Sequence, residues 1–419
     1  DEKKVDLHCH ANNVAHNTHE ISTSQLIVRR GQPFSITLEG TKCTFGTRVP
    51  MCDVGTKALW SCSINATSSL QTGCVTLNVT PPADAPVGKY SLSIELGRPL
   101  AVKESLVVLF NPWCQNDWVY LPDEKERQEY VMNEQGHIYT GTAHCFSPMF
   151  WDFGQFEEEM VDICLKLLDV NPKHKRDPED DVSARCNPIY VGRVISAMIN
   201  CYDDMGVLQG CWDGDYQDGV CPTRWTSSVS ILQRWFQSGC KAVKYGQCWV
   251  FAGVMCTVMR FFGIPCRVVT NFVSGHDTNN SLTIDQYFDE NFHVWVEGWM
   301  KRPDLDQDGR YDGWQVLDPT PQERSEGMFC CGPAPVSAIH DGHTNLKYDV
   351  PFVFSEVNAD VVKWKADGSK IKMKYLTDTA KVGQKISTKA VGSTAINDLT
   401  NTYKYKEGKD ANANSFSQR

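Results

Sequence analysis

Hydrophobic and polar side chains alternate along much of the first 110 positions. The clearest alternation occupies residues 34–38, 75–79 and 90–96. Turn signals such as Pro81-Pro82 and Val87-Gly88 separate these stretches. Short segments of period two with turns between them are typical of strands in an antiparallel β-sandwich. Because Asn111-Pro112-Trp113 ends the alternating part, we predict that residues 1–112 form such an N-terminal sandwich.

The spacing of apolar residues becomes helical beyond this point. Apolar side chains recur at helical intervals from Phe156 to Leu167, and residues 193–200 and 229–236 continue the pattern. Residues 247–262 are apolar on nearly every side and Gly263 follows them, which predicts a buried helix. Strand-like segments then occupy residues 266–272, 291–299 and 313–317. Helices followed by strands predict an α+β domain over residues 113–419, and therefore an α+β multidomain chain.

The length and composition suit a folded protein with more than one domain. The chain has 419 residues, of which 41% are hydrophobic and 22% are charged. At roughly 100–200 residues per domain, this length accommodates about two to four domains. The formal net charge of −10 offers nucleic acid no basic surface, so a nucleic-acid function is not expected. The same charge is compatible with bound divalent cations. We find no run of about 18 apolar residues, so no membrane span is expected.

Cysteine is abundant, with 18 residues spread over the whole length. No CxxC pair is matched by a second one, which disfavours a structural zinc site, and disulfide scaffolds belong to much shorter chains. We therefore expect mostly reduced thiols, several of them buried as small hydrophobic side chains. Reduced thiols are typical of an intracellular protein, so we expect a cytoplasmic location, with export without a signal peptide as the alternative.

Three short motifs carry side chains suited to nucleophilic catalysis. Cys248 stands at the start of the predicted buried helix, where the partial positive charge of a helix N-terminus favours a thiolate. His293 lies on a half-buried strand, and Asp318 ends the next apolar strand, where a carboxylate can orient an imidazole. Each also has an ordinary interpretation, as an inert core thiol, a core histidine and a turn aspartate before proline. Together they match the order of a Cys-His-Asp nucleophile system.

The motifs around these residues resemble those of animal transglutaminases, close to the tissue and epidermal types. The resemblance runs almost from end to end and is carried by residues 29–32 (RRGQ), 110–113 (FNPW), 190–193 (YVGR), 245–252 (YGQCWVFA), 263–265 (GIP), 318–322 (DPTPQ) and 351–354 (PFVF). The segment YGQCWVFA is highly specific in this context. The catalytic cysteine, histidine and aspartate of the family fall on Cys248, His293 and Asp318.

The resemblance implies a β-sandwich followed by a papain-like catalytic core. Family members normally carry two further C-terminal β-barrels, which this sequence does not contain. The implied reaction is protein-glutamine γ-glutamyl transfer, with glutamine-containing proteins as acyl donors and lysine or polyamine amines as acceptors. Trp212 matches the family tryptophan whose indole N–H helps to hold the oxyanion, with the backbone N–H of Cys248 as the other donor. From the residues alone, Trp212 would be an ordinary packed aromatic side chain.

Ca²⁺ is the cofactor that the resemblance implies, at up to three sites built from oxygen ligands. The first site would use the carbonyl of Ala197 with Asn200 and Asp204. The other two sites would use Asp277, Asn279 and Ser281, and then Asn358, Thr379 and Glu407. From the residues alone, each of these groups would be a polar loop.

Three features depart from the family pattern or add to it. The stretch between Asp285 and His293 is shorter than usual, so either the acceptor side is altered or part of a loop is missing, and we favour the missing loop. Asn412 stands where the family often has a glutamate, which would weaken the third calcium site. Three cysteines match positions that can form an inactivating disulfide in tissue-type relatives, although reduced thiols are the default: Cys201, Cys330 and Cys331.

Two alternatives remain beside calcium-dependent transfer. A papain-like cysteine protease would use the same three residues, because it also proceeds through a thioester, and the two differ in whether an amine or water attacks. A non-catalytic structural relative would be expected to lack the nucleophile, whereas Cys248 is present. Trp212 and the sandwich favour transfer, and the oligomeric state is left open.

Overall fold

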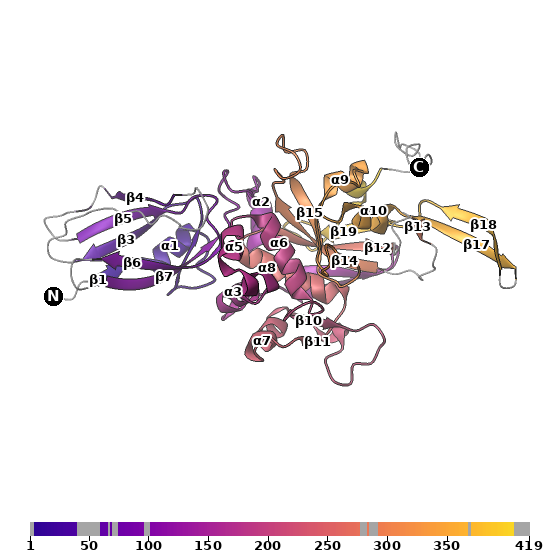
Figure 1. Cartoon of the computed structure of the whole chain (residues 1–419), viewed down its shortest axis with the longest axis horizontal. Coiled ribbons are helices and arrows are strands. Elements are labelled where there is room, and N and C mark those ends of the chain that lie inside the picture. The colour runs from indigo at the N-terminus through magenta and orange to yellow at the C-terminus, as the bar shows by residue number, and fades with distance from the viewer. Residues whose placement is uncertain are drawn as a thin grey trace.

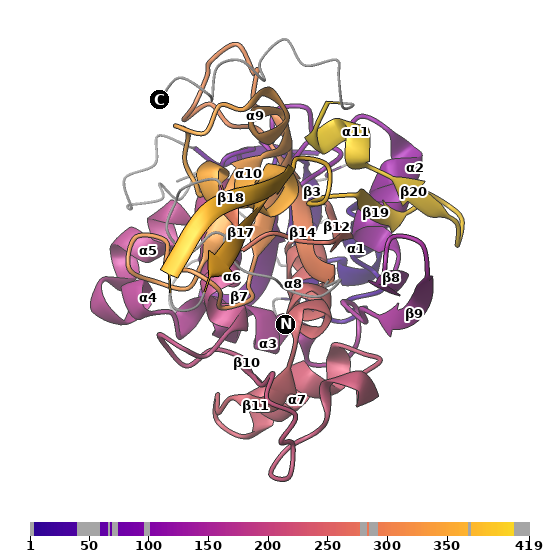
Figure 2. The same cartoon turned by 90° about the vertical axis from the view of Figure 1, so that its right-hand side faces the viewer.

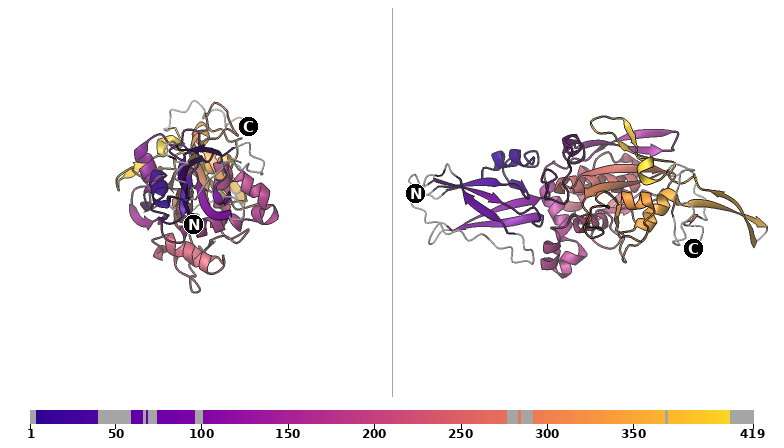
Figure 3. Two further views of the ribbon diagram at one scale, coloured as in Figure 1. Left: turned by 90° about the vertical axis from the view of Figure 1, so that its left-hand side faces the viewer. Right: turned by 90° about the horizontal axis from the view of Figure 1, so that it is seen from above.

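The computed structural model describes residues 4–39, 59–65, 68, 74–95, 101–276, 283–284, 292–367 and 370–405. The molecule is elongated, with the N-terminal strands at one end, a mixed α/β body in the middle and a long β-hairpin at the other end (Figure 1). Figure 3 shows the same order from above. In the described part of the chain, no helix is both long and apolar enough to cross a bilayer.

The N-terminal strands form two packed sheets. One sheet has the order β1 (Lys4–Asp6), β3 (Phe34–Glu39), β5 (Cys74–Thr80) and β4 (Ser61–Ile64), and all of its pairs are antiparallel. The other has the order β2 (Leu26–Arg29), β7 (Ala101–Leu109) and β6 (Gly88–Glu95), and helix α1 (Cys9–Ala15) precedes β2. The core between the sheets contains Leu26, Val28, Phe34, Ile36, Leu106 and Val108.

The prediction of a wholly antiparallel sandwich is wrong at one pair, because β2 and β7 run parallel. A parallel pair needs a long connection between its strands, and here the connection contains most of the sandwich. Alternation of apolar residues marks a strand but carries no information on its direction, so the sequence pattern could not show this pairing. The domain boundary at residue 112 stays a prediction.

Helices and strands are mixed along the rest of the chain. The helices are α2 (Glu124–Arg127), α3 (Met160–Asp169), α4 (Pro172–Arg176), α5 (Pro178–Ala184), α6 (Pro188–Ile199), α7 (Val229–Gln237), α8 (Cys248–Phe262), α9 (Val336–Asp341), α10 (Val350–Asn358) and α11 (Thr400–Tyr403). A short π-helix at Gln128–Met132 and a short 3₁₀-helix at Pro222–Arg224 complete the helical elements. Strands outside the central sheet are β8 (Gln135–Gly141), β9 (Phe146–Asp152), β10 (Leu208–Gly210), β11 (Val243–Gly246), β13 (Thr283–Ile284), β17 (Asp360–Asp367) and β18 (Lys370–Asp378).

A six-stranded sheet forms the centre of this body. Its order is β16 (Cys331–Pro335), β15 (Gly313–Asp318), β14 (Phe292–Met300), β12 (Cys266–Phe272), β19 (Lys385–Lys389) and β20 (Ile396–Asp398). The neighbouring pairs are antiparallel. Helix α8 packs against β14 and β12, and Figure 2 shows it among the strands in an end-on view. The strands predicted at residues 266–272, 291–299 and 313–317 are confirmed to within one residue at every end.

The predicted buried helix is confirmed as α8, in which every residue is buried. It ends at Gly263, whose φ of +87° lies in the left-handed region that favours glycine. Two of the predicted helices differ at their starts. Helix α3 begins at Met160 rather than near Phe156, and α6 begins at Pro188, because proline is well suited to the first helical position.

The central sheet is covered on both faces, and alternation along each strand divides its side chains between two cores. Val294 and Val296 of β14 join the core with α8, whereas Trp295 joins the core with α9, α10 and α11. Leu317 and Val316 of β15 divide in the same way. Residues 293 and 318 therefore belong to the face that α10 covers.

A buried arginine ties the sandwich to the central body. Arg30 forms a two-pronged ion pair with Asp117, at 2.6 and 2.7 Å, and donates to the carbonyl oxygen of Cys186 at 2.8 Å. Nearby, the N–H of Phe110 donates to the carbonyl oxygen of Phe262 at the end of α8. Because Arg30 and Asp117 are almost fully buried, this junction is a packed and hydrogen-bonded interface.

Candidate active site

The chain enters helix α8 through strand β11, and this entry places Cys248 at the first helical position. The carbonyl of Gln247 accepts the N–H groups of Val250 and Phe251, so the helix is closed from its first turn. The backbone N–H of Cys248 stands among the N–H groups that an α-helix leaves without an internal partner. The Cys248 side chain is buried, with 7% of its residue surface exposed. The start of α8 is therefore a small electropositive position that contains a thiol.

His293 and Asp318 approach each other from neighbouring strands. The Nε2 atom of His293 lies 2.6 Å from Oδ2 of Asp318, and both side chains are buried. The other carboxylate oxygen of Asp318 accepts the backbone N–H of Thr320 at 2.9 Å, which fixes the carboxylate plane. The Cys248 thiol also interacts with the His293 ring. With Nε2 against the carboxylate, Nδ1 is the ring nitrogen left to contact the thiol.

Charged neighbours control the protonation of this imidazole. Burial alone would lower the pKa of His293, but the Asp318 carboxylate and the Cys248 thiol raise that pKa well above the ordinary value of 6.5. A histidine held in its charged form beside a thiol stabilises the thiolate. The three predicted residues thus come together with the geometry of a nucleophile, a proton carrier and its orienting carboxylate.

Two further residues belong to this cluster and were not assigned a role from the sequence. The amide nitrogen of Gln322 lies 3.0 Å from Oδ2 of Asp318 and 3.0 Å from Oε1 of Glu356. Glu356, on α10, is fully buried, and Oε1 lies 3.8 Å from Nε2 of His293. Burial raises the pKa of Glu356 to about 8. The one sequence signal was a glutamate within the mostly apolar segment of residues 350–357.

Trp212 follows strand β10 and lies beside the start of α8. Its ring stacks on Phe251 with a centroid distance of 6.3 Å and an interplanar angle of 8°, and 54% of Trp212 is exposed. A Cβ atom at Gly210 would lie 2.3 Å from the Trp212 ring, so glycine leaves room for the indole. The side chain of Gln247 donates to the carbonyl oxygen of Cys211 at 2.9 Å. These contacts hold the indole against Phe251 in the first turn of α8, and its role stays a prediction.

The loop after α6 contains the first predicted cation site. Hydrogen bonds from Val207 to the carbonyl of Met198, and from Cys201 to that of Leu208, close the loop. Both carboxylate oxygens of Asp204 are buried and have no regular hydrogen-bonding partner among the described residues.

Burial raises the pKa of Asp204 from 3.8 to about 7, with the backbone N–H of Gly206 acting against the shift. The adjacent Asp203 is by contrast satisfied, since it accepts from Arg324 at 2.7 Å and from the N–H of Phe329 at 2.6 Å. An unpartnered buried carboxylate beside other oxygen atoms fits a hard cation.

The other predicted ligands of this site lie where α6 ends. Ala197 is in the last turn of α6, whose final carbonyl groups have no partner within the helix. Asn200 is the residue that caps this helix, and its side-chain oxygen accepts the N–H of Tyr202 at 3.2 Å. Its amide nitrogen donates to the carbonyl groups of Pro319 and Phe329, which leaves the oxygen side facing the loop.

The other two predicted calcium sites are only partly covered by the described residues. Asp277, Asn279, Ser281 and Glu407 lie outside them, as do Asp285 and Asn412. Asn358 ends α10 and Thr379 directly follows β18. Since Val361 pairs with Asp378, these two residues flank the base of the β17–β18 hairpin. Cys201, Cys330 and Cys331 are free thiols.

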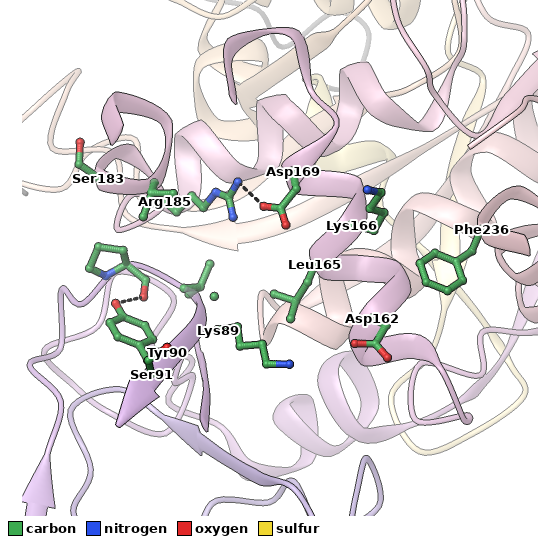
Figure 4. Close-up of a pocket in the computed structure, with 14 residues that line it drawn as sticks. Lys89, Tyr90, Ser91, Asp162, Leu165, Lys166, Asp169, Ser183, Arg185 and Phe236 are labelled. Atoms are coloured by element: carbon green, nitrogen blue, oxygen red, sulfur yellow. Dashed lines mark hydrogen bonds and ion pairs between the residues drawn. The ribbon is translucent and has the colours of Figure 1, made fainter. Parts of the chain in front are cut away.

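A cleft of about 570 Å³ lies apart from this site, between strand β6 and helix α3 (Figure 4). Its walls carry the cations Lys89 and Lys166 and the anions Asp162 and Asp169, and Arg185 forms an ion pair with Asp169 at 2.8 Å. None of the predicted site residues lines it. Because its charges are mixed and its charged groups other than Arg185 are exposed, the cleft indicates no particular ligand.

Comparisons with known proteins point in one direction. Residues 231–319 match the model of the transglutaminase-like superfamily, and residues 3–49 match the N-terminal model of the transglutaminase family. The chain is 48% identical to human protein-glutamine gamma-glutamyltransferase 2, over 99% of this chain and 66% of that protein. It is 47% identical to human protein-glutamine gamma-glutamyltransferase 5, over 96% of this chain and 61% of that protein.

A solved structure shows the same fold. The structure of red sea bream transglutaminase superimposes with a TM-score of 0.88 at 45% identity, covering 97% of this chain and 66% of that one. The chain thus spans just under two thirds of the length of the curated relatives that it matches.

Proposed function

The chain belongs to the transglutaminase family, and we propose that it catalyses protein-glutamine γ-glutamyl transfer. The Cys248 thiolate attacks the carboxamide carbon of a glutamine side chain, and the C–N bond breaks. Ammonia leaves with a proton supplied by the imidazolium of His293, which yields a thioester. A primary amine, from lysine or a polyamine, then attacks the thioester carbon, and its proton passes to His293 as the thiolate leaves. The product is an isopeptide or a secondary amide.

One observation carries this proposal, namely the contact series from Cys248 through His293 to Asp318. Asp318 accepts the Nε2 proton of His293, so the imidazole keeps one orientation while Nδ1 gains and loses a proton. The backbone N–H of Cys248 and the indole N–H of Trp212 are the proposed donors to the oxyanion of the tetrahedral intermediate. The stacked and partly exposed position of Trp212 suits contact with a substrate.

Ca²⁺ is the proposed cofactor, and the described residues of the first site fit it. The ion would be held by the carbonyl of Ala197, by Asn200 and by Asp204, where the buried oxygens of Asp204 lack other partners. When bound, Ca²⁺ would be the positively charged partner of the Asp204 carboxylate and would order the loop. Since this loop leads directly into β10 and Trp212, its order bears on the position of the indole.

The test of the function is incorporation of a fluorescent primary amine into a glutamine-rich protein. The chain should incorporate the amine in millimolar calcium, and Cys248→Ala should not. Cleavage of peptide bonds without amine incorporation would instead identify a papain-like protease. Inactivity toward both substrates, with Cys248 still reactive toward iodoacetamide, would overturn the transfer proposal.

The test of the cofactor is a calcium titration of the same reaction. Asp204→Ala should raise the calcium concentration for half-maximal rate far more than Glu407→Ala does. A larger effect of Glu407→Ala would move the dominant site to the third group of ligands. Full activity in excess chelator would exclude the calcium requirement.

A further inference from the structure

The turn after β15 brings the amide group of Gln322 into contact with the predicted catalytic cluster. Residues 318–322 fold back on themselves, since the N–H of Thr320 donates to Asp318 and the N–H of Gln322 donates to the carbonyl of Thr320. The Gln322 amide nitrogen thereby lies 2.9 Å from Nε2 of His293 and 3.0 Å from Oδ2 of Asp318. Its third neighbour is Oε1 of Glu356, also at 3.0 Å.

The number of available protons decides which of these contacts are hydrogen bonds. His293 has a single proton on Nε2, and the 2.6 Å contact assigns it to Oδ2 of Asp318. Gln322 has two amide protons, and two carboxyl oxygens lie at 3.0 Å, one of Asp318 and one of Glu356. Gln322 therefore bridges the two carboxyl groups. Its amide nitrogen lies close to Nε2 of His293 because both nitrogens donate to the same oxygen, Oδ2 of Asp318.

Glu356 depends on this bridge. Among the described residues, Gln322 is the hydrogen-bond donor to its Oε1, and Oε2 is buried without a partner. The nearest charged donor is Nε2 of His293, 3.8 Å from Oε1. A buried carboxyl that loses its one donor is strongly driven to find another. In this site the next donor available is the histidine proton that now goes to Asp318.

We propose that Gln322 is a positioning residue that occupies Glu356 and so reserves the Nε2 proton of His293 for Asp318. This assignment concerns the reaction proposed above and rests on it. Asp318 and Glu356 approach His293 from different elements, β15 and α10, so a ring that turned toward Glu356 would change its tilt. Such a turn would move Nδ1 away from Cys248. The amide of Gln322 thus selects between two carboxyl partners for one imidazole.

The first test replaces Gln322 with an apolar side chain of similar length. In the chain of 419 residues, Gln322→Met should lower kcat for amine incorporation on the order of a hundredfold, since small misplacements of a reacting group have effects of that size. KM for the glutamine substrate should change little. The rate of Cys248 alkylation by iodoacetamide at pH 6 should fall about tenfold, because thiolate reactivity there depends on the imidazolium. Alkylation is measured both in chelator and in millimolar calcium.

The second test removes the competing acceptor. The double variant Gln322→Met, Glu356→Leu should recover most of the alkylation rate at pH 6, because leucine has no oxygen that could accept the histidine proton. Gln315→Met is the matched control, since Gln315 is a buried amide on β15 that bonds Arg302 and backbone carbonyls instead of the cluster. It should lower thermal stability and leave the pH profile of alkylation unchanged. If Gln322→Met does not fold, Gln322→Leu removes the same donors with a smaller apolar side chain and should change alkylation in the same direction.

The outcomes separate this proposal from the function on which it rests. Wild-type alkylation and kcat in Gln322→Met, or an equal loss in the single and double variants, would overturn the positioning role. If the wild type does not incorporate amines but the alkylation rates of wild type, single variant and double variant follow the predicted order, the transfer reaction is overturned and the role of Gln322 is supported. The groups that face His293 in these measurements are Cys248 of α8, Asp318 of β15 and Glu356 of α10.

Discussion

Replacing Asp204 with asparagine removes the buried and unpartnered carboxylate of the loop after α6. In the metal-free chain the pKa of Asp204 is raised from 3.8 to about 7, chiefly by burial. A group whose folded-state pKa lies above its unfolded value stabilises the fold below the unfolded pKa, and this contribution is lost as the pH rises through the folded value. The wild-type chain should therefore lose stability between about pH 4 and pH 7 as Asp204 titrates. The Asp204→Asn variant should not show this loss, because asparagine does not titrate.

The size of the effect follows from the shift. One pKa unit corresponds to about 1.4 kcal/mol, so the whole shift corresponds to roughly 4 kcal/mol. Because both carboxylate oxygens are buried, solvent screens little of this penalty. By the linkage relation, the raised pKa of Asp204 lowers the free energy of unfolding by roughly 2 kcal/mol at pH 5 and by roughly 4 kcal/mol at pH 8. In chelator, the free energy of unfolding of Asp204→Asn relative to wild type should rise by about 2–3 kcal/mol between these pH values.

The assay is urea unfolding of both chains in chelator at pH 5 and pH 8, followed by tryptophan fluorescence. Millimolar calcium should reverse the order at pH 8, because the ion binds the wild-type carboxylate in the folded chain and stabilises it by mass action. A stability difference that is the same at both pH values would refute the reasoning. So would a variant less stable than wild type at pH 8 in chelator.

Three further substitutions test the site. Cys248→Ala should reduce amine incorporation to background with thermal stability nearly unchanged, and an active variant would exclude Cys248 as nucleophile. Asp318→Asn removes the main charge that raises the pKa of His293, so amine incorporation should fall by about 10²–10⁴ and alkylation of Cys248 at pH 6 should slow; an unchanged pH profile would contradict this. Gly210→Ala places a Cβ 2.3 Å from the Trp212 ring, so it should lower kcat toward the value of Trp212→Ala, about 10²–10³ below wild type; full activity would show that the indole position is unimportant.

The sequence could predict the parts of this molecule that local pattern determines. Helix α8 and strand β12 follow from runs of apolar residues bounded by Gly263, and such runs need no knowledge of distant segments. Strand direction is different, since alternation is the same whether a neighbour is parallel or antiparallel, and the β2–β7 pair was therefore missed. Family resemblance supplied what pattern could not, including the roles expected of Trp212 and Asp204.

Tertiary contacts account for what the sequence could not predict at the site. Gln322 and Glu356 are 34 positions apart in the chain, and their contact forms only when α10 packs on the face of the sheet that contains His293. Neither residue type is unusual by itself. A buried glutamate becomes a signal only when the number of donors around it is known, and that number is a property of the folded chain.

The buried Arg30 junction also bears on how the chain can fold while it is being synthesised. The sandwich residues emerge first, but the partner carbonyl of Cys186 follows 156 positions after Arg30. At about 5–20 residues per second, a ribosome needs roughly 8–30 seconds to reach it. During that interval a nascent sandwich can collapse and form the Arg30–Asp117 ion pair, while the part of the guanidinium that will contact Cys186 is still hydrated. The order of synthesis therefore separates collapse of the N-terminal strands from their attachment to the body, and attachment is the later, slower event.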